Sequence, residues 1–403
     1  MTIEENTAWR ISLKERREAA GLFQGDLAGA VGISREYFNK IETGKKIPPE
    51  KLRRMLDKAM SLRDINGAME IIFDYVKVRF LSRDLQGMIE GVLKMNMEHF
   101  YRDGFGSHGY ERLYRSGSIT ALASDDPTKG CIVEMKGQGC RMFEGILVAQ
   151  NRSWYDFFGE CLAAGCVFKR LDIAINDKVG FLNVPQLIAK CENGECASRF
   201  NKWREEKGGE GLRYDSEDGM RIGRSLYIGS EKSELHLCIY EKAMEQLMKK
   251  GIPLEEAITQ NRVEARLKND RAMNAVYDLL GRYDVEATVF EIINRYVCFL
   301  DAVEGVPPSE WLVNPEWAWF MGEGRGKLHL TTKPEPYTWE RSMRWLNNQC
   351  APTLAAAMEI DQKQGTNYVG EMLERAKATQ SDKHKAIIEQ VTASPEDMVF
   401  PAV

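Results

Sequence analysis

The chain has no hydrophobic run long enough to span a membrane, which takes about 20 predominantly apolar residues. Its first residues, Met1 to Asn6, have neither the basic stretch nor the apolar stretch of a secretory signal peptide. The nine cysteines include no Cys-x-x-Cys pair, which argues against a zinc site and a disulfide framework. We therefore expect a cytoplasmic protein whose cysteines are free and buried.

Two further absences narrow the function classes. The chain has no Gly-x-x-x-x-Gly-Lys-Ser/Thr loop, so we expect no bound nucleoside triphosphate. It also has no global positive charge, because the formal net charge is −5. The charge is uneven, since residues 1–60 hold 12 Lys and Arg against 9 Asp and Glu. Any binding of nucleic acid must then depend on local patches rather than on the field of the whole chain.

The composition of the chain is that of a folded protein with several domains. Hydrophobic residues make up 43% and charged residues 29%, and 403 residues correspond to two or three domains at roughly 100–200 residues each. Apolar periodicity predicts an all-α domain over 1–66, strands alternating with helices over 67–300, and a mainly helical region over 301–403. Residues 193–220, rich in Gly and charged residues, predict an insertion or a hairpin.

The middle region supplies most of the predicted elements. Strands are predicted over 71–78, 109–114, 130–135, 167–177, 225–228, 234–240 and 262–267. Helices are predicted over 141–149, 154–164, 184–192, 242–250 and 270–280.

The N-terminal segment has the pattern of short helices joined by a tight turn. Apolar residues recur at helical spacing from Leu13 to Ile41, Gly32 permits the turn, and Ser34 is suited to cap the next helix. Residues 13–49 resemble the phage-repressor (Xre/Cro-type) helix-turn-helix, which implies that the helix after Ser34 enters the DNA major groove. The side chains expected at the DNA are Gln24, Arg35, Glu36, Tyr37, Asn39, Lys40 and Lys45. The alternative is a small helical bundle that binds another protein.

Three predicted strands, 170–177, 234–240 and 262–267, alternate polar with apolar residues, so each has one polar face. Those faces carry Arg170, Asp172, Asn176, Glu234, His236, Cys238, Tyr240, Arg262, Glu264 and Arg266. Carboxylates suit Mg²⁺ or Mn²⁺, forked arginine donors suit phosphate oxygens, and a tyrosine can act as a nucleophile. The alternative is a half-exposed sheet whose cross-strand ion pairs are worth roughly 0.2–1 kcal/mol each.

Four ordered stretches resemble the Rep_trans family, which comprises rolling-circle replication initiators of Gram-positive plasmids and MobT relaxases of integrative conjugative elements. They are 170–177 (RLDIAIND), 227–233 (YIGSEKS), 239–246 (IYEKAMEQ) and 262–267 (RVEARL). The helix-turn-helix ahead of them is similar to the MobT branch. The resemblance implies an α+β fold: an all-α helix-turn-helix domain, a relaxase domain with a central antiparallel sheet flanked by helices, and a C-terminal helical extension.

Carried over residue by residue, the resemblance implies that Asp172 and Glu264 bind a divalent metal ion, Mn²⁺ or Mg²⁺. Tyr240 would be the nucleophile, Lys242 and Arg262 would support the scissile phosphate, and Arg170 would contact DNA. Tyr227 is the alternative nucleophile.

The chain departs from the family pattern at two positions. Glu231 replaces the usual Arg of the Gly-Ser-Arg-Lys-Ser motif, which puts a phosphate contact there in doubt. Asn176 stands where an acidic residue is common, which makes Asp177 the less certain metal candidate. By alternation, Asp177 also points away from the polar face.

The implied activity is nicking of one DNA strand at an origin of transfer by metal-assisted tyrosine transesterification, with a 5′-phosphotyrosine intermediate. The partners implied are origin DNA, both double-stranded and melted, together with a coupling protein and accessory factors. The commoner type of relaxase, with a His-hydrophobic-His pair, is excluded because none of the five histidines is so spaced. One of them, His108, lies in a Gly-rich loop near which DNA could pass. The alternatives are a plasmid replication initiator, a non-catalytic DNA-binding regulator and a hydrolytic nuclease.

Overall fold

The computed structural model describes residues 3–20, 22–60, 68–210, 221–323, 327–332 and 351–380, together with 388 and 392. The chain divides into two compact units. The first comprises Met1–Phe73 and Leu171–Thr331, and the second comprises Asp74–Arg170 and Thr332–Val403. None of the described helices is both long enough and apolar enough to cross a membrane.

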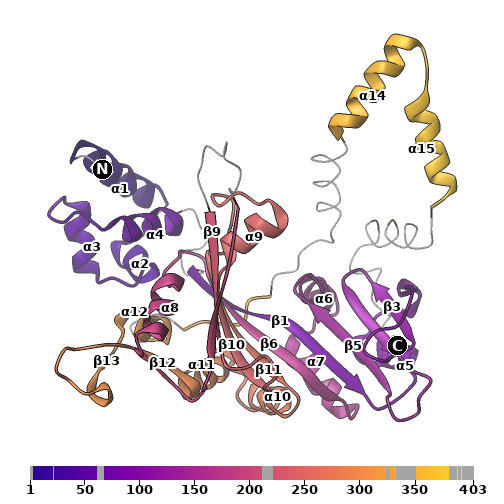
Figure 1. The fold of residues 1–403 in the computed structure, drawn as a ribbon, viewed down its shortest axis with the longest axis horizontal. Coiled ribbons are helices and arrows are strands. Elements are labelled where there is room, and N and C mark those ends of the chain that lie inside the picture. Colours follow the sequence, from indigo (N-terminus) through magenta and orange to yellow (C-terminus); the bar gives the residue numbers. More distant parts are fainter. Residues whose placement is uncertain are drawn as a thin grey trace. The chain divides into compact units, whose positions relative to one another are not determined.

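The first unit begins with four helices, as the sequence predicts for a helix-turn-helix (Figure 1). They are α1 (Ile3–Ala19), α2 (Gln24–Ala30), α3 (Arg35–Glu42) and α4 (Glu50–Met60). Ser34 caps α3 by accepting a hydrogen bond from the Tyr37 amide, and Gly32 adopts a φ of 69° in the turn before it. Leu13, Leu27, Phe38, Ile41 and Leu56 form the buried interior of this bundle. The predicted boundary near residue 66 lies outside the described residues and stays a prediction.

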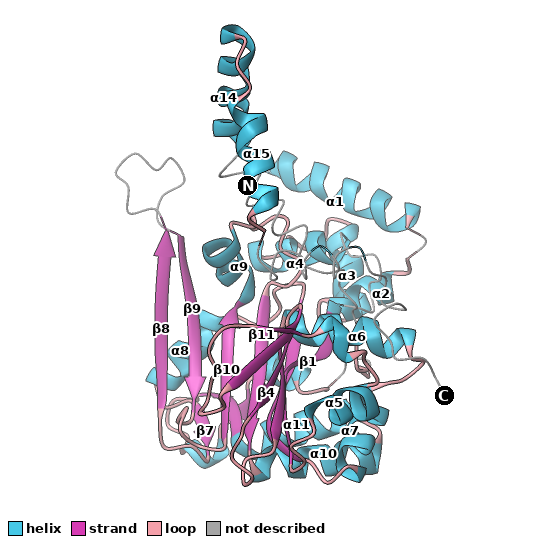
Figure 2. Cartoon of the chain, turned by 90° about the vertical axis from the view of Figure 1, so that its right-hand side faces the viewer, coloured by secondary structure: helices cyan, strands magenta, loops and turns pink. Residues whose placement is uncertain are grey.

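The first unit also contains a twisted sheet with the strand order β6-β11-β10-β9-β8 (Figure 2). Its strands are β6 (Val167–Asp177), β8 (Trp203–Glu210), β9 (Arg221–Ile228), β10 (Leu235–Glu241) and β11 (Asn261–Lys268). The pairs β8 with β9, β9 with β10 and β10 with β11 are antiparallel. The stretch predicted as an insertion or a hairpin, 193–220, contributes strand β8, which pairs with β9 from residue 221 on. Residues 211–220 lie outside the described part.

Helices pack on this sheet because the strands have one apolar face, which carries Leu226, Leu237, Ile239, Val263 and Ala265. The unit's helices after the N-terminal bundle are α8 (Val184–Glu192), α9 (Lys242–Lys250), α10 (Asp270–Arg282), α11 (Val285–Tyr296) and α12 (Pro315–Phe320). Helix α8 contacts β9 and β10, whereas α10 and α11 contact β11. A small sheet of β7 (Cys196–Ser198), β12 (Val297–Asp301) and β13 (Leu312–Val313) and a short turn, η4 (Pro308–Glu310), complete the unit.

The second unit has its own antiparallel strands in the order β2-β3-β4-β5-β1. They are β1 (Met69–Phe80), whose first residues belong to the other unit, β2 (Tyr101–Arg102), β3 (Arg112–Ser116), β4 (Ile119–Ala123) and β5 (Cys131–Lys136). The helices are α5 (Leu85–Met88), η2 (Ile89–Leu93), η3 (Met97–His99), α6 (Gln138–Ala149), α7 (Trp154–Ala163), α14 (Ala351–Gln364) and α15 (Tyr368–Ala378). Phe157 packs edge to face against both Phe143 and Trp154 in its core.

The predicted fold class is confirmed: helices at the N-terminus, an antiparallel sheet flanked by helices, and helices toward the C-terminus. All seven predicted strands and all five predicted helices of the middle region are present, with ends shifted by a few residues. Short strands such as β4 and β12 were not predicted, since strands of five residues show few alternations.

Candidate active site

The register of β9, β10 and β11 places the predicted catalytic residues on one face of the first unit's sheet. Tyr240 lies opposite Arg262 on one side and Ser225 on the other. One step along, Cys238 lies between Glu264 and Tyr227. Since directly opposed residues share a face, these two rows lie side by side on the polar face of the sheet.

Tyr240 and Glu264 are in direct contact. The Tyr240 hydroxyl donates a hydrogen bond of 2.8 Å to Oε1 of Glu264, and the exposed fractions of the two residues are 8% and 3%. The second carboxylate oxygen, Oε2, accepts hydrogen bonds from Nε (2.8 Å) and Nη2 (2.7 Å) of Arg266. Burial lowers the pKa of Arg266, but the adjacent Glu264 carboxylate outweighs it and the net shift is upward. The phenol therefore lies against a carboxylate whose second oxygen is paired with the Arg266 guanidinium.

Arg262 is held by a residue that the sequence analysis did not assign to the site. Its Nε donates a hydrogen bond of 2.6 Å to Oδ1 of Asn176, and Nδ2 of Asn176 donates one of 2.8 Å to Oε1 of Glu70. Lys178 also forms an ion pair of 2.9 Å with Glu70. The signal available in the sequence was Glu70 itself, an acid directly before the predicted apolar strand 71–78. All four polar side chains in these contacts are buried.

Lys242 begins α9 directly after the strand that carries Tyr240. Its ammonium lies 5.4 Å from the centroid of the Tyr240 ring and forms an ion pair of 2.7 Å with Glu245. Lys242 is thus close enough to influence the charge around the phenol, while the ion pair with Glu245 fixes its position.

Asp172 is the second predicted metal ligand, and it is 3% exposed on β6. Its charge acts on Arg266, the same guanidinium that bonds Glu264. Among the residues that the structure describes, no group of three His, Cys, Asp or Glu side chains is placed to hold a metal ion. Two carboxylates are nevertheless the donor set with which proteins hold Mg²⁺ when water and a substrate phosphate supply the other oxygens. The donor chemistry fits such an ion, provided that Arg266 yields one Glu264 oxygen.

Asp177 lies among hydrogen-bond donors of the loop that follows β6. Its carboxylate accepts hydrogen bonds from the amides of Gly180 and Leu182 and from Nδ2 of Asn261, each of 2.9 Å. Burial raises the pKa of Asp177 despite these donors. The carboxylate organises the loop after β6 and does not join the face that carries Tyr240, in agreement with the alternation argument.

Tyr227, the alternative nucleophile, lies on the same face as Tyr240 but in a different setting. Its ring is covered by the guanidiniums of Arg204 and Arg266, at 4.4 and 5.8 Å from the ring centroid. Burial raises the pKa of Tyr227 above its ordinary value, and burial likewise raises the pKa of the neighbouring Cys238 thiol to about 12. Both groups are therefore protonated at neutral pH.

Arg170 and His108 belong to the second unit. The Arg170 guanidinium lies 4.1 Å from the centroid of the Tyr75 ring. Glu134, which accepts a hydrogen bond from the Tyr75 hydroxyl, forms ion pairs with Lys77 and Lys136 at 3.2 and 3.1 Å, and His108 Nε2 lies 3.9 Å from it. Lys77 and Lys136 thus share one buried carboxylate, while Arg170 lies over the ring of Tyr75, whose hydroxyl bonds the same carboxylate.

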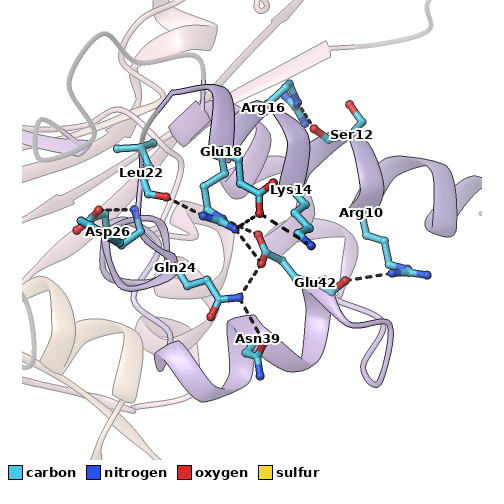
Figure 3. A network of polar contacts seen from close by, with 12 residues as sticks. Arg10, Ser12, Lys14, Arg16, Glu18, Leu22, Gln24, Asp26, Asn39 and Glu42 are labelled. Carbon is cyan, nitrogen blue, oxygen red and sulfur yellow. Dashed lines mark hydrogen bonds and ion pairs between the residues drawn. The ribbon is translucent and has the colours of Figure 1, made fainter.

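Two of the predicted DNA-contacting residues of the helix-turn-helix, Gln24 and Asn39, belong to a network of polar contacts around Glu42 (Figure 3). Arg35, Glu36, Asn39, Lys40 and Lys45 are exposed, whereas Gln24 and Tyr37 are partly buried. Nε2 of Gln24 donates to Oε2 of Glu42 (2.7 Å) and to Oδ1 of Asn39 (3.3 Å). Glu42 is itself bound by Arg17, at 2.6 Å. This buried network fixes α2 against α3 and leaves the outer face of α3 available.

Glu36 is the exception to the positive character of that surface. It forms an exposed ion pair of 2.7 Å with Lys40, and the hydrogen bond from Lys40 lowers the pKa of Glu36. The pair offsets the charge of Lys40, so Arg35 and Lys45 carry more of the positive charge that this surface presents.

Three stretches of the chain match models of known protein families. Residues 166–373 match the family model of the replication initiation factor (Rep_trans), residues 70–160 that of the rolling-circle replication initiation protein N-terminal domain, and residues 11–59 that of a helix-turn-helix domain. The chain is 37% identical to the putative DNA relaxase NicK of Bacillus subtilis over 355 residues, which are 88% of this chain and 99% of that protein.

A solved structure shows a similar fold. The rolling-circle replication initiator protein of Geobacillus stearothermophilus matches with a TM-score of 0.55 and 22% identity, over 66% of this chain and 99% of that one.

Proposed function

Because the chain belongs to the replication initiation factor (Rep_trans) family, with a helix-turn-helix domain ahead of the family region, we propose that it is a DNA relaxase. It nicks one strand of an origin of transfer through Tyr240 and remains attached to the DNA. The observation that carries this proposal is the buried contact of 2.8 Å between the Tyr240 hydroxyl and the Glu264 carboxylate, on a sheet face that also carries Asp172, Arg262 and Arg266.

The geometry supports Tyr240 as the nucleophile. Its hydroxyl proton is directed at Oε1 of Glu264, which can receive it as the phenol oxygen attacks phosphorus. The new O–P bond forms as the bond from phosphorus to the 3′ oxygen breaks, which leaves a 5′-phosphotyrosine and a free 3′-hydroxyl. The number of phosphoester bonds is unchanged, so the reverse reaction can reseal the strand without a nucleotide.

The remaining residues of the face bind and neutralise the phosphate. Arg262, held in place by Asn176, offers guanidinium donors beside the attacking phenol, and Lys242 adds positive charge from the start of α9. Asp172 and Glu264 would hold a divalent cation. When bound, such an ion neutralises negative charge on the phosphate and assists ionisation of the phenol.

The helix-turn-helix would position the duplex origin. Arg35, Asn39 and Lys40 on α3 can reach base edges, and Lys45 can reach a phosphate. Arg170, in the second unit, stays a proposed DNA contact. A coupling protein and accessory factors stay proposals that rest on the relaxase assignment alone.

Trapping of the covalent adduct tests the proposal. Purified protein is incubated with a single-stranded origin oligonucleotide and Mn²⁺ or Mg²⁺, and the product is digested and identified by mass spectrometry. The expected adduct is on Tyr240, and Tyr240→Phe abolishes it while Tyr227→Phe forms it. An adduct on Tyr227, or cleavage by Tyr240→Phe without any adduct, would contradict the proposed mechanism.

The same chemistry would serve a plasmid replication initiator. The N-terminal helix-turn-helix and the match to a protein named a relaxase over nearly its whole length favour transfer over replication. Replication of a plasmid that carries the cognate origin, in cells that express the protein, would instead favour the initiator.

A further inference from the structure

A groove in the first unit lies beyond the residues considered so far. It has a volume of about 530 Å³ and lies between the loop at 199–202, the turn at 229–234 and the adjoining ends of α10 and α11. Three cations line it, namely Arg199, Lys202 and Arg271, against a single carboxylate, Glu234. Within the described part of the chain, none of the three cations forms an ion pair. The groove therefore keeps a net positive charge that is available to an anion.

An aromatic platform lies inside this groove. The rings of Phe200 and Tyr296 stack with centroids 5.0 Å apart and an interplanar angle of 23°. The Arg271 guanidinium lies 5.9 Å from the centroid of the Tyr296 ring. Unpaired cations beside stacked aromatic rings are the combination that binds single-stranded nucleic acid, in which cations contact phosphates and rings stack on bases.

The backbone holds the platform in place. The Gly229 amide donates to the Lys202 carbonyl (2.7 Å), and the Arg199 amide donates to the Tyr296 carbonyl (3.0 Å). Gly229 has a φ of 95°, and a Cβ there would lie 2.9 Å from a ring carbon of Phe200 and 3.2 Å from Cβ of His236. Only glycine permits Phe200 to lie so close to the strand, which gives the first residue of the Gly229–Ser233 motif a physical role.

The same contact connects the groove to the catalytic face. His236 is on β10, four residues before Tyr240, so the two positions are about 13 Å apart at 3.3 Å per residue. Alternation puts both on the polar face of the sheet. A second, smaller cavity of about 150 Å³ shares Leu235, Arg271 and Tyr296 with the groove and continues it between α10 and α11. An extended strand leaving Tyr240 along β10 toward His236 would thus reach the end of the groove at Phe200.

We propose that this groove binds the single-stranded part of the target strand next to the scissile phosphate. Arg199, Lys202 and Arg271 contact phosphates, and Phe200 with Tyr296 stacks on bases. The inference rests on the proposed function, since it assigns the groove to the strand that Tyr240 cuts. Stacking is tolerant of sequence, so the groove would hold the melted strand while the helix-turn-helix reads the duplex.

Binding of fluorescein-labelled oligothymidine of 20 nucleotides, measured by anisotropy at several salt concentrations, tests the groove without requiring cleavage. The triple variant Arg199→Ala/Lys202→Ala/Arg271→Ala should bind at least about tenfold more weakly, and the slope of log K against log salt should fall by about 2, at about 0.7 per lost phosphate contact. Phe200→Leu, which keeps an apolar side chain but removes the ring, should weaken binding about 5- to 100-fold. Lys363→Ala, an exposed lysine of α14, is the matched control and should bind like wild type.

The outcomes separate this inference from the proposed function. If the groove variants bind oligothymidine like wild type, or if duplex DNA competes as well as the single strand, the groove assignment is wrong even where Tyr240 still forms its adduct. If the groove variants lose binding but wild type forms no adduct on Tyr240, the relaxase assignment fails and the single-strand site stands. Circular dichroism of each variant checks that the fold is retained.

Discussion

At the scale of single residues, Glu264, Arg262 and Asn176 around Tyr240 are each held by a specific neighbour. Glu264 accepts from both Tyr240 and Arg266, and Asn176 links Arg262 to Glu70. Burying such groups without partners would cost about 1–3 kcal/mol each, so the network defines one geometry for the phenol and the guanidinium. We therefore expect its members to affect activity even where they touch no substrate.

Asn176→Ala tests that positioning effect. The change removes the acceptor of the Arg262 Nε hydrogen bond and leaves a buried guanidinium free to shift, so nicking should slow by about 10- to 100-fold. The measurement is single-turnover cleavage of an origin oligonucleotide. Asn193→Ala, at the exposed C-cap of α8, is the control and should cleave normally. Wild-type cleavage by Asn176→Ala would show that Arg262 does not depend on this contact.

Glu134, in the second unit, should make the stability of the protein depend on pH. Burial alone raises its pKa, but Tyr75, Lys77 and Lys136 outweigh that effect, and the net shift is below the ordinary value of 4.5. A depressed carboxyl pKa contributes stability above pH 4.5 that is lost as the pH falls through the folded-state value. Glu134→Gln should therefore destabilise the protein at pH 7, and the difference from wild type should shrink between pH 5 and pH 3.

Urea unfolding at pH 7, 5 and 3.5 measures this difference. The control is Asp125→Asn, since the side chain of Asp125 is 79% exposed in its ion pair with Arg112 and an exposed pair contributes little. A gap between wild type and Glu134→Gln that stays constant with pH would rule out the depressed pKa as the source of the effect.

At the scale of elements, the turn between α2 and α3 shows how the helix-turn-helix packs against the rest of the first unit. Gly32 has a φ of 69°, and a Cβ there would lie 2.6 Å from a ring carbon of Phe181 and 3.1 Å from Trp319. The rings of Phe181 and Trp319 pack against each other at 4.1 Å between centroids. The glycine is thus required both by the turn and by the aromatic pair that covers it.

Gly32→Ala should accordingly destabilise the protein by about 1–2 kcal/mol from the backbone conformation alone, with more from the contact with Phe181. Differential scanning calorimetry should show a lower Tm. Gly29→Ala is the matched control, because Gly29 is inside α2 and a Cβ there would meet nothing within 4 Å. That variant should be neutral or slightly stabilising, since Ala favours the helix. Equal effects at the two positions would contradict the packing argument.

At the scale of the whole molecule, contacts from α4 join the helix-turn-helix to the rest of the first unit, which contains the sheet that carries Tyr240. Lys51 forms an ion pair of 2.7 Å with Glu316, and Nζ of Lys58 donates a hydrogen bond of 2.6 Å to the Ala257 carbonyl. Burial lowers the pKa of Lys58. A DNA reader held by such contacts presents α3 in a defined orientation to the catalytic sheet, in contrast to a reader on a flexible tether.

Hydrogen exchange should show this coupling. We expect the amides of α3 and those of β10 to lose protection together as urea is raised, because the two segments belong to one packed unit. Lys51→Ala/Lys58→Ala should let α3 exchange earlier than β10, whereas Arg54→Ala, an exposed residue of the same helix, should not. Early exchange of α3 in the wild type would show that the domain opens independently.

Sequence periodicity by itself determined the strands and helices of the middle region and the polar face of each strand, because side chains alternate with a period of two. It placed Asp172, Tyr240 and Glu264 on polar faces, and the family resemblance suggested their roles. It left open which residues oppose one another.

Only the tertiary structure decided that register. Tyr240 lies opposite Arg262, and Cys238 lies opposite Glu264. This pairing depends on hydrogen bonds between residues more than 20 positions apart in the chain, which no local pattern encodes. The link from Arg262 through Asn176 to Glu70, and the approach of Phe200 to Gly229, likewise join distant segments whose meeting depends on how the whole chain packs.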